Sequence, residues 1–525
     1  MGRIQILWVD DEIELLKPHV IFLEEKDYAV STANNGDDAL ELIEEKQFDI
    51  IFLDENMPGK SGLETLSEIK NKHPELPVVM VTKSEEEDLM DDAIGSKISD
   101  YLIKPVNPKQ ILLSIKKNIH TKRLVSKKTA ADYLKEFQNI GSALNHQMSF
   151  KEWTDVYQKI IYWELELENS NDPGLEEIIG SQKIEANQLF CKYIQENYIN
   201  WINETSDNTP ILSHTLVKNK VIPNLQNENS VVFFVVVDNL RYDQWKILQP
   251  IISEHFSVDS DELYCGILPT ATQFARNAMF AGLMPLDIQK QYPGLWVGSN
   301  EEGGKNQHEE TFIKDQLIRR GVKLGCSYNK ITNLGSGKKL VEDIPNLFNN
   351  GLNVIVYNFV DMLSHARTEM EVIKELAPNE SAYRSITLSW FEHSPLFNAL
   401  QRIAEIGKSN PEKNVKLVIT TDHGSIRVRE PSRLVGDKNT TTNLRYKEGK
   451  SLSYSGRDVF DVGTPENALL PKSSISSRYV FAKFDKYFVY PNNYNYYMNF
   501  YKNSFQHGGI SMEEMLIPTI TLSIK

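Results

Sequence analysis

The sequence predicts an α/β protein of three parts: a doubly wound N-terminal domain, a helical middle segment and a larger C-terminal α/β domain. Over residues 1–120, short apolar runs alternate with amphipathic helical stretches, which is typical of βαβ units. Aromatic and aliphatic residues then recur at helical spacing. Unbroken β-branched runs in the remaining chain favour buried parallel strands. The length of 525 residues is also typical of about three domains.

The composition is that of an ordinary globular protein, with 41% hydrophobic and 25% charged residues. The start MGRIQILWVDDE lacks the features of an export signal, and no apolar run reaches the roughly 18 residues that span a bilayer. We therefore expect a cytoplasmic protein without membrane insertion. Cys191, Cys265 and Cys326 are odd in number and widely spaced, so we expect reduced thiols.

The negative charge is concentrated at the N-terminal end. Residues 1–120 contain 13 Lys and Arg against 25 Asp and Glu, so this segment carries -12 of the net charge of -15. No helix-turn-helix pattern with a basic recognition face closes the chain. We therefore expect no sequence-specific DNA binding.

Acidic residues follow the apolar runs of the first domain. Asp10 and Asp11 come directly after the first run, and Asp54 follows a central one. Strand ends of a doubly wound sheet meet in one crevice, where three carboxylates would attract a hard cation such as Mg²⁺. Thr82 ends another run and Lys104 follows DYLI, which adds a hydroxyl and a cation suited to phosphate oxygens.

The motifs VDDE, LDENMPGKSGLE, VTKSEEE and DYLIKP, in this order, resemble the flavodoxin-like receiver domain of response regulators. The resemblance implies that Asp54 is the phosphoacceptor and binds Mg²⁺ together with Asp10 and Asp11. It implies that Thr82 and Tyr101 form the switch pair and that Lys104 is the phosphate-sensing cation. Phosphorylation would bias a two-state surface around the switch pair. A cognate histidine kinase is the implied phosphate donor, and by analogy we expect phosphorylation-dependent homodimerisation.

We predict three domains: a receiver over residues 1–121, a helical bundle linker over 122–208, and an effector domain over 209–525. In the linker, Trp153 and Trp163 fall on an apolar stripe at helical spacing, which is more often core than ligand site. We expect this bundle to transmit the receiver's state to the effector.

Three expected strands of the effector, 231–237, 353–359 and 415–420, are each followed by residues able to bind a metal. Because such strand ends point into one crevice, we expect these groups to converge there. A further His lies in QHGG near the C-terminus. Mixed His and carboxylate ligands favour zinc over manganese, and six groups can hold two metals about 4 Å apart. The six residues are Asp238, Asp361, His365, Asp422, His423 and His507.

A hydroxyl nucleophile is available in LPTATQF, where Thr270 and Thr272 precede an apolar helical stretch. A bound metal could lower the pKa of such a hydroxyl, and a helix N-terminus favours an incoming phosphate group. Spacing alone leaves the choice between the two threonines open.

The segments DNLRYD, PTAT, DMLSH, TDHG and HGGISMEEM are similar to the PglZ domain of the alkaline phosphatase superfamily, over about residues 210–525. The resemblance implies that Thr272 is the nucleophile and forms a covalent phospho-threonine. It implies two zinc sites, one formed by Asp361, His365 and His507, the other by Asp238, Thr272, Asp422 and His423. A threonine in place of the usual serine favours a phosphodiester substrate.

Residues 427–450 are rich in cations and could form a basic lid over an anionic substrate such as a short oligonucleotide. A solvated insertion loop is the alternative interpretation. The candidate substrate-binding residues are Arg427, Arg429, Arg433 and Arg445.

The order of receiver, linker and PglZ domain resembles PorX-type response regulators of type IX secretion. The resemblance implies hydrolysis of cyclic or linear oligonucleotides and action with a sigma factor on secretion genes. One alternative is a phosphorylation-gated binding module that contacts a sigma factor or a secretion motor component, with zinc mainly structural. Another is an ordinary phosphomonoesterase. An intact Thr272 favours chemistry, because a structural metal site needs no nucleophile.

Overall fold

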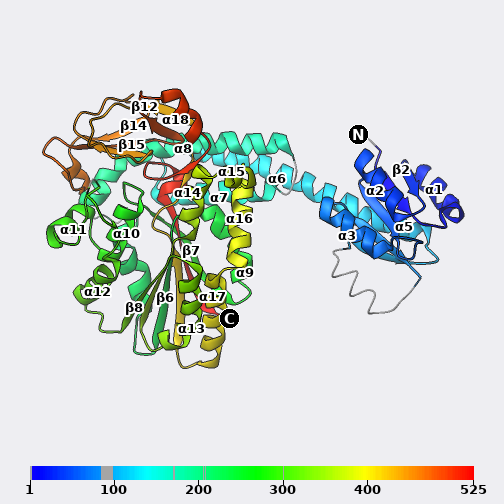
Figure 1. Cartoon of the computed structure of the whole chain (residues 1–525), viewed down its shortest axis with the longest axis horizontal. Helices are drawn as coiled ribbons and strands as arrows, with labels where there is room; N and C mark the ends of the chain where they lie inside the picture. The colour runs from blue at the N-terminus through cyan, green and yellow to red at the C-terminus, as the bar shows by residue number, and fades with distance from the viewer. Residues whose placement is uncertain (1–2, 84–97, 169–171, 205, 207–208, 300) are drawn as a thin grey trace. The chain divides into compact units, whose positions relative to one another are not determined.

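The structure is a computed structural model that describes residues 3–83, 98–168, 172–204, 206, 209–299 and 301–525; the side chains of residues 120–128 and 173 also lie outside the description. The chain forms two compact units, Met1–Leu134 and Lys135–Lys525 (Figure 1). The acidic run in VTKSEEE, and residue 208 at the predicted end of the linker, lie outside the described residues. Among the described helices, none is both long and apolar enough to cross a membrane.

The first unit contains a five-stranded parallel sheet in the order β2-β1-β3-β4-β5. The strand order reverses beside β1, so a crevice opens at the carboxyl ends of β1 and β3. The predicted doubly wound receiver fold is confirmed. The strands are β1 (Gln5–Val9), β2 (Ala29–Ala33), β3 (Ile50–Asp54), β4 (Val78–Thr82) and β5 (Asp100–Ile103).

Both faces of this sheet are covered. Trp8 of β1 packs in one core cluster with residues of α1 and α5, whereas its neighbour Val9 packs in a second cluster with residues of α2 and α3. Gly62 begins α3 at a close approach, because a Cβ there would lie 2.3 Å from the carbonyl oxygen of Asp54. The helices are α1 (Lys17–Glu24), α2 (Gly36–Glu45), α3 (Gly62–Lys72) and α5 (Pro108–Ile115).

The middle of the chain is helical, as predicted, with α6 (Thr121–Leu144), α7 (Phe150–Glu168) and α8 (Pro173–Asn203). Helices α7 and α8 pack through aromatic side chains: the rings of Trp153 and Phe190 have centroids 5.4 Å apart, and Trp153 is buried. The second unit therefore includes these two helices together with the effector domain.

The second unit is built on a six-stranded sheet in the order β7-β18-β10-β6-β9-β8. The four strands β10, β6, β9 and β8 run parallel, and β18 is antiparallel to both β10 and β7. The three strands expected from β-branched runs are β6, β9 and β10. The bounds are β6 (Ser230–Val237), β7 (Phe256–Cys265), β8 (Cys326–Ile331), β9 (Leu352–Tyr357), β10 (Asn414–Thr420) and β18 (Leu516–Ile524).

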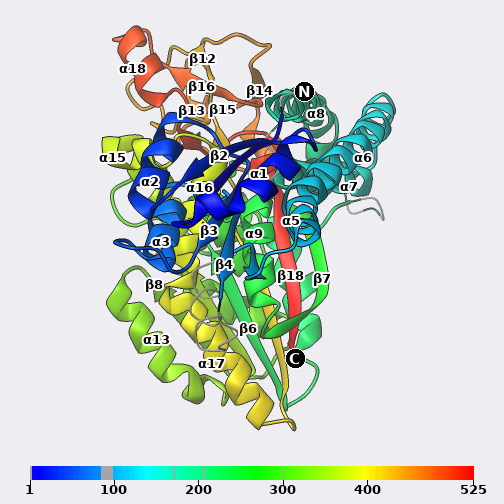
Figure 2. The same cartoon turned by 90° about the vertical axis from the view of Figure 1, so that its right-hand side faces the viewer.

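Helices cover both faces of this sheet, which explains why β6 is buried along its whole length. Phe233 packs on Phe348, at the end of α13, whereas the next residue, Phe234, packs on Phe280 of α10. Figures 1 and 2 show α13 and α17 side by side on one face. The bounds are α9 (Tyr242–Ile252), α10 (Thr272–Ala281), α11 (Pro285–Gln291), α12 (Glu309–Arg319), α13 (Leu334–Leu347), α16 (Glu380–Glu392) and α17 (Pro395–Ser409).

Residues 426–506, here called the small lobe, carry short strands that lie beyond one end of the main sheet (Figure 1). Helices α14 (Phe359–Glu369) and α15 (Glu371–Leu376) follow β9 and precede the small lobe in the sequence. The lobe and the segment after it contain β11 (Ile426–Arg427), β12 (Glu430–Arg433), β13 (Tyr446–Gly449), β14 (Val459–Val462), β15 (Arg478–Ala482), β16 (Lys486–Val489), α18 (Tyr494–Tyr501), β17 (Phe505–Gln506) and α19 (Met512–Met515).

Candidate functional site

The first unit gathers three carboxylates and one ammonium group in the crevice beside β1. Single oxygen atoms of Asp10, Asp11 and Asp54 lie within 4.8 Å of one another. Lys104 Nζ lies 2.8 Å from Asp10 Oδ2 and 3.0 Å from Asp54 Oδ2. Burial raises the pKa of Asp54, Lys104 lowers it, and the charges of Asp10 and Asp11 raise it again. This arrangement of carboxylate oxygens fits a hard divalent cation.

The predicted switch residues lie on β4 and on its neighbour β5, the edge strand of the same sheet. Thr82 is the last residue of β4 and is half-buried, while Tyr101 lies in β5 with 42% of its surface exposed. Tyr101 is paired with Met80 and Ile103 with Thr82, so the tyrosine lies two residues back from the crevice end of the strand pair.

In the second unit, a buried cluster of two carboxylates and one imidazole lies at the ends of two neighbouring parallel strands. Asp238 directly follows β6, and Asp422 and His423 follow β10, which pairs with β6. All three side chains are buried, and one ligand atom of each lies within 4.8 Å of the others. Residues far apart in the sequence thus meet because the parallel strands end at the same edge.

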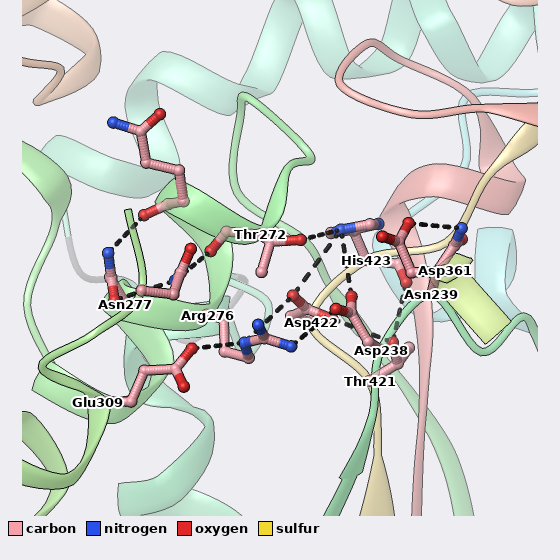
Figure 3. A network of polar contacts seen from close by, with 12 residues as sticks. Asp238, Asn239, Thr272, Arg276, Asn277, Glu309, Asp361, Thr421, Asp422 and His423 are labelled. Atoms are coloured by element: carbon pink, nitrogen blue, oxygen red, sulfur yellow. Dashed lines mark hydrogen bonds and ion pairs between the residues drawn. The ribbon is translucent and has the colours of Figure 1, made fainter. Parts of the chain in front are cut away.

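Thr272 faces this group from the first turn of α10. Its Oγ1 lies 3.0 Å from His423 Nε2, and Figure 3 shows the hydroxyl directed at the imidazole ring. His423 Nδ1 lies 3.2 Å from the carbonyl oxygen of Gly424. With its proton on Nδ1 and donated to that carbonyl, the ring directs the Nε2 lone pair toward Thr272 and the carboxylates.

A second group combines two residues of α14 with one from the C-terminal segment. His365 Nε2 lies 3.4 Å from Asp361 Oδ2, and His507 Nε2 lies 3.7 Å from Asp361 Oδ1. His507 Nδ1 is 3.1 Å from the carbonyl oxygen of Thr270, which again leaves Nε2 free to bind a metal. The side chain of His365 is 61% exposed, so this group is open to solvent.

The two groups adjoin each other through stacked imidazole rings. The ring centroids of His423 and His507 lie 4.1 Å apart, with an angle of 13° between the ring planes. A hydroxyl, three carboxylates and three imidazoles therefore line one site. The structure brings together all seven residues predicted for it: Thr272, Asp238, Asp361, His365, Asp422, His423 and His507.

The electrostatics of the site fit bound cations. Burial raises the pKa of Asp238 and of Asp422, and each of the two is raised further by a neighbouring carboxylate. Asp238 Oδ1 and Asp422 Oδ2 are buried without a hydrogen-bond donor among the described residues. For Asp361, burial raises the pKa, but His365 and His507 outweigh burial and lower it. A buried carboxylate of this kind requires a proton or a cation, and the oxygen and nitrogen donors suit a metal such as zinc.

Two functional neighbours were missed by sequence reasoning. The buried Arg276, one turn after Thr272 in α10, lies 2.9 Å from Asp238 Oδ2 and 2.7 Å from Glu309 Oε1 (Figure 3). An arginine inside the apolar stretch TQFARNAMFA was the available signal. Asn239 has a φ of 64°, and its Nδ2 lies 3.3 Å from Asp361 Oδ1. It links the two groups, and the sequence gives no sign of that role.

The four candidate substrate-binding arginines do not form one cluster. Arg429 and Arg433 are exposed, and Arg427 is half-buried and donates to the carbonyl oxygen of Pro378. Arg445 is fully buried, and its Nη2 lies 2.6 Å from Glu514 Oε2. The prediction is corrected for Arg445, because this guanidinium braces the small lobe against α19 and has no face open to a substrate.

Comparison with known proteins divides the chain in the same order as the fold. Residues 6–116 match the response regulator receiver domain, 123–202 the PorX response regulator linker domain, and 216–522 the BREX system PglZ alkaline phosphatase-like domain. Fold and site together define a response regulator with an alkaline phosphatase-like effector domain. The chain belongs to the PglZ family, and its domain order is that of a PorX-type response regulator.

Curated relatives of this chain include transcriptional regulatory proteins that match about a quarter of its length or less. The alginate biosynthesis transcriptional regulatory protein AlgB of Pseudomonas putida is 34% identical over 128 residues, 24% of this chain and 29% of that protein. The transcriptional regulatory protein ResD of Bacillus subtilis is 35% identical over 112 residues, 21% of this chain and 46% of that protein. The chain thus spans less than half the length of these relatives.

Solved structures of receiver proteins also align with 22–23% of the chain. Chemotaxis protein CheY4 of Vibrio cholerae has 26% identity and a TM-score of 0.22, covering 22% of this chain and 100% of its own. A receiver domain protein of Clostridium thermocellum has 30% identity and a TM-score of 0.22, covering 23% of this chain and 98% of its own.

Proposed function

We propose that this response regulator is a metal-dependent phosphodiesterase that hydrolyses cyclic or linear oligonucleotides under the control of Asp54 phosphorylation. The observation that supports it most directly is the placement of Thr272 Oγ1 at 3.0 Å from His423 Nε2, beside two groups of metal-binding side chains. A purely structural metal site would be closed by its ligands and would need no hydroxyl beside them.

Zinc is the metal we propose for both effector groups, and Mg²⁺ for Asp10, Asp11 and Asp54. Asp361, His365 and His507 would hold one zinc ion, and Asp238, Asp422, His423 and the Thr272 oxygen the other. When bound, the two ions supply a lowered pKa for the hydroxyl and for an attacking water, together with positive charge for phosphate oxygens.

The nucleophile in this proposal is Thr272 Oγ1. It attacks phosphorus, a new P–O bond forms, and the bond to the leaving nucleoside oxygen breaks with its electron pair. The hydroxyl proton passes to solvent, and the leaving oxygen takes a proton from solvent. The threonine then carries the remaining nucleotide as a phosphodiester. Water attacks this phosphorus, the bond to Thr272 Oγ1 breaks, the hydroxyl is restored and a phosphomonoester is released.

Other residues of the chain hold these groups in place. Arg276 binds Asp238 Oδ2, so that Oδ1 of the same carboxylate faces the site. The Nδ1 contacts of His423 and His507 with backbone carbonyls fix the direction of both Nε2 atoms. Asn239 bridges Asp361 Oδ1 and Ser364 Oγ, both at 3.3 Å. The geometry is thus set before substrate binds, which lowers the cost of reaching the transition state.

We propose a diester rather than a monoester substrate because the nucleophile is a threonine, as in the phosphodiesterase branch of the superfamily. The exposed Arg429 and Arg433 of the small lobe offer cations to the phosphates of a longer substrate. The buried Arg445 takes no part.

Control by the receiver is the second part of the proposal. A receiver domain implies a cognate histidine kinase, and phosphorylation of Asp54 would drive homodimerisation and change the effector's activity. We propose a role in type IX secretion and its gene expression, with a sigma factor and a secretion motor component as protein partners.

The decisive experiment measures hydrolysis of cyclic dinucleotides, short oligonucleotides, bis-nitrophenyl phosphate and nitrophenyl phosphate by zinc-loaded protein. Each substrate is tested with wild type and Thr272→Val, with and without acetyl phosphate and Mg²⁺. Diester turnover that disappears in Thr272→Val supports the proposal. No turnover of any diester, with zinc confirmed bound, overturns it and favours the binding module.

A further inference from the structure

Helix α8 of the linker presents one buried face to the effector domain. Asn187, Cys191 and Tyr198 lie on this face, at spacings of four and seven residues, and their exposures are 0%, 2% and 1%. All three side chains hydrogen-bond to backbone groups of the two segments that carry Thr272 and His507. The linker helix therefore touches the site through its supporting segments rather than through its ligands.

The segment after His507 is held by two side chains of α8. Asn187 Oδ1 accepts a hydrogen bond from the Met512 backbone N–H at 2.8 Å, and Asn187 Nδ2 donates to Glu513 Oε2 at 3.0 Å. Cys191 Sγ donates to the carbonyl oxygen of Ile510 at 3.3 Å. Residues 510–513 begin three positions beyond His507, so their placement constrains that of the imidazole.

The segment before Thr272 is held by the same face. The Leu268 backbone N–H donates to Tyr198 Oη at 2.8 Å. Between these attachments, Thr270 joins the two segments: its Oγ1 donates to the carbonyl oxygen of Gly509 at 2.9 Å and accepts from the Gly508 N–H at 3.0 Å. Helix α8 and Thr270 thus form one buried framework behind Thr272 and His507.

Partly buried ion pairs oppose a shift of α8 relative to the segment after His507. Lys183 of α8 lies 3.4 Å from Glu513 Oε1 and 2.8 Å from Glu164 Oε2 of α7. Glu513 also abuts the residue after His423, because a Cβ on Gly424 would lie 2.0 Å from the Glu513 carbonyl oxygen. A shift of α8 would separate these partly buried charges unless residues 510–513 moved with it.

We propose that α8 is a positioning element that sets the place of His507, and thereby the zinc affinity of the group formed with Asp361 and His365. This inference rests on the proposed function and names how the site is regulated. Asp361 and His365 both belong to α14, so His507 is the one member of the group supplied by another segment. A displacement of α8 that withdraws His507 leaves two ligands in this group, which weakens its metal binding.

The test compares zinc binding to full-length wild type, Asn187→Leu and Gln188→Leu by titration against a competing chelator, with no activity assay. Gln188 is an exposed amide on the next residue of the same helix and serves as the matched control. We expect two effector sites in wild type and Gln188→Leu, and about a 10-fold or larger loss of affinity at one site in Asn187→Leu. Wild-type affinity at both sites of Asn187→Leu overturns the proposal.

A second variant covers the case in which Asn187→Leu does not fold. Asn187→Asp keeps the size of the side chain and the acceptor for Met512, but repels Glu513, and should weaken the same site. Acetyl phosphate should change the zinc affinity of this site in wild type and in Gln188→Leu, a response that a merely structural role of α8 would not produce. Unchanged affinity on phosphorylation overturns the regulatory role. Absence of zinc binding to wild type would instead contradict the proposed function.

Discussion

Thr272 Oγ1 and His423 Nε2 lie 3.0 Å apart, although 151 residues separate them in the chain. The contact joins the first turn of α10 to the end of β10 and places a hydroxyl among the buried carboxylates. Because the ring's Nδ1 contacts the Gly424 carbonyl, the direction of Nε2 is fixed from behind. The imidazole thus presents its Nε2 to the hydroxyl in a fixed direction.

Thr272→Ser should keep diester hydrolysis within about 10-fold of wild type, because the substitution keeps the oxygen. Thr272→Val removes the oxygen at nearly constant volume, and we expect a loss of about 1000-fold or more in kcat. Initial rates with bis-nitrophenyl phosphate measure both. Equal activity in the valine variant would remove Thr272 as nucleophile.

Arg276→Met should destabilise the zinc-free second unit by about 3–5 kcal/mol, because it leaves the buried carboxylates of Asp238 and Glu309 without their shared partner. Urea unfolding measures the free energy. The control is Arg402→Met, whose ion pair with Glu405 is exposed and should contribute less than about 1 kcal/mol. A small effect at Arg276 would show that these carboxylates are protonated without zinc.

The stability of the second unit should fall in acid because of Glu164. Burial raises the pKa of this carboxyl, but the charges of Lys183 and Arg384 outweigh burial and lower it from 4.5 to about 2. Since the folded pKa is lower than the unfolded one, the contribution is full above pH 4.5 and is lost as pH falls toward 2. It amounts to about 3 kcal/mol.

Glu164→Gln should therefore lower the free energy of unfolding at pH 6, and the difference from wild type should shrink steadily between pH 4.5 and pH 2. Urea titrations at several pH values measure it. Glu166→Gln, an exposed position on the same helix, is the matched control and should show no such convergence. A difference that does not depend on pH would contradict the assigned ion pairs.

Asp54→Asn should raise the stability of the first unit in Mg²⁺-free buffer by an amount on the order of 1 kcal/mol. The change removes a buried negative charge beside Asp10 and Asp11, while Lys104 keeps its contact with Asp10 at 2.8 Å. Thermal unfolding measures this effect, with the exposed Glu41→Gln as control. The same variant should take up no label from radioactive acetyl phosphate, and label retained in it would place the phosphoryl group elsewhere.

The sequence predicted those parts of the fold and site that depend on local pattern. Asp54, Asp238 and Asp422 each follow an apolar run, and parallel strands bring such residues to one edge whatever the rest of the chain does. The strands β6, β9 and β10 were predictable because burial on both faces requires unbroken apolar runs.

Residues whose role depends on distant partners could not be predicted. Arg445 lies in a basic stretch that suggests a solvent-exposed lid, yet its partner is Glu514, 69 residues further along. Asn187 shares the helical pattern of its neighbours, and its contacts with Met512 and Glu513 arise only from tertiary packing. Hydrophobic periodicity indicates which face of a helix is buried, but does not say which backbone groups that face will meet.

The grouping of α7 and α8 with the effector domain bears on how such proteins can be recombined. A fragment starting at residue 135 would carry the buried face of α8 with it, whereas one starting at residue 209 would leave Met512 and Leu268 without the acceptors that Asn187 and Tyr198 provide. Helices α7 and α8 and the effector domain therefore have to be inherited as a single piece.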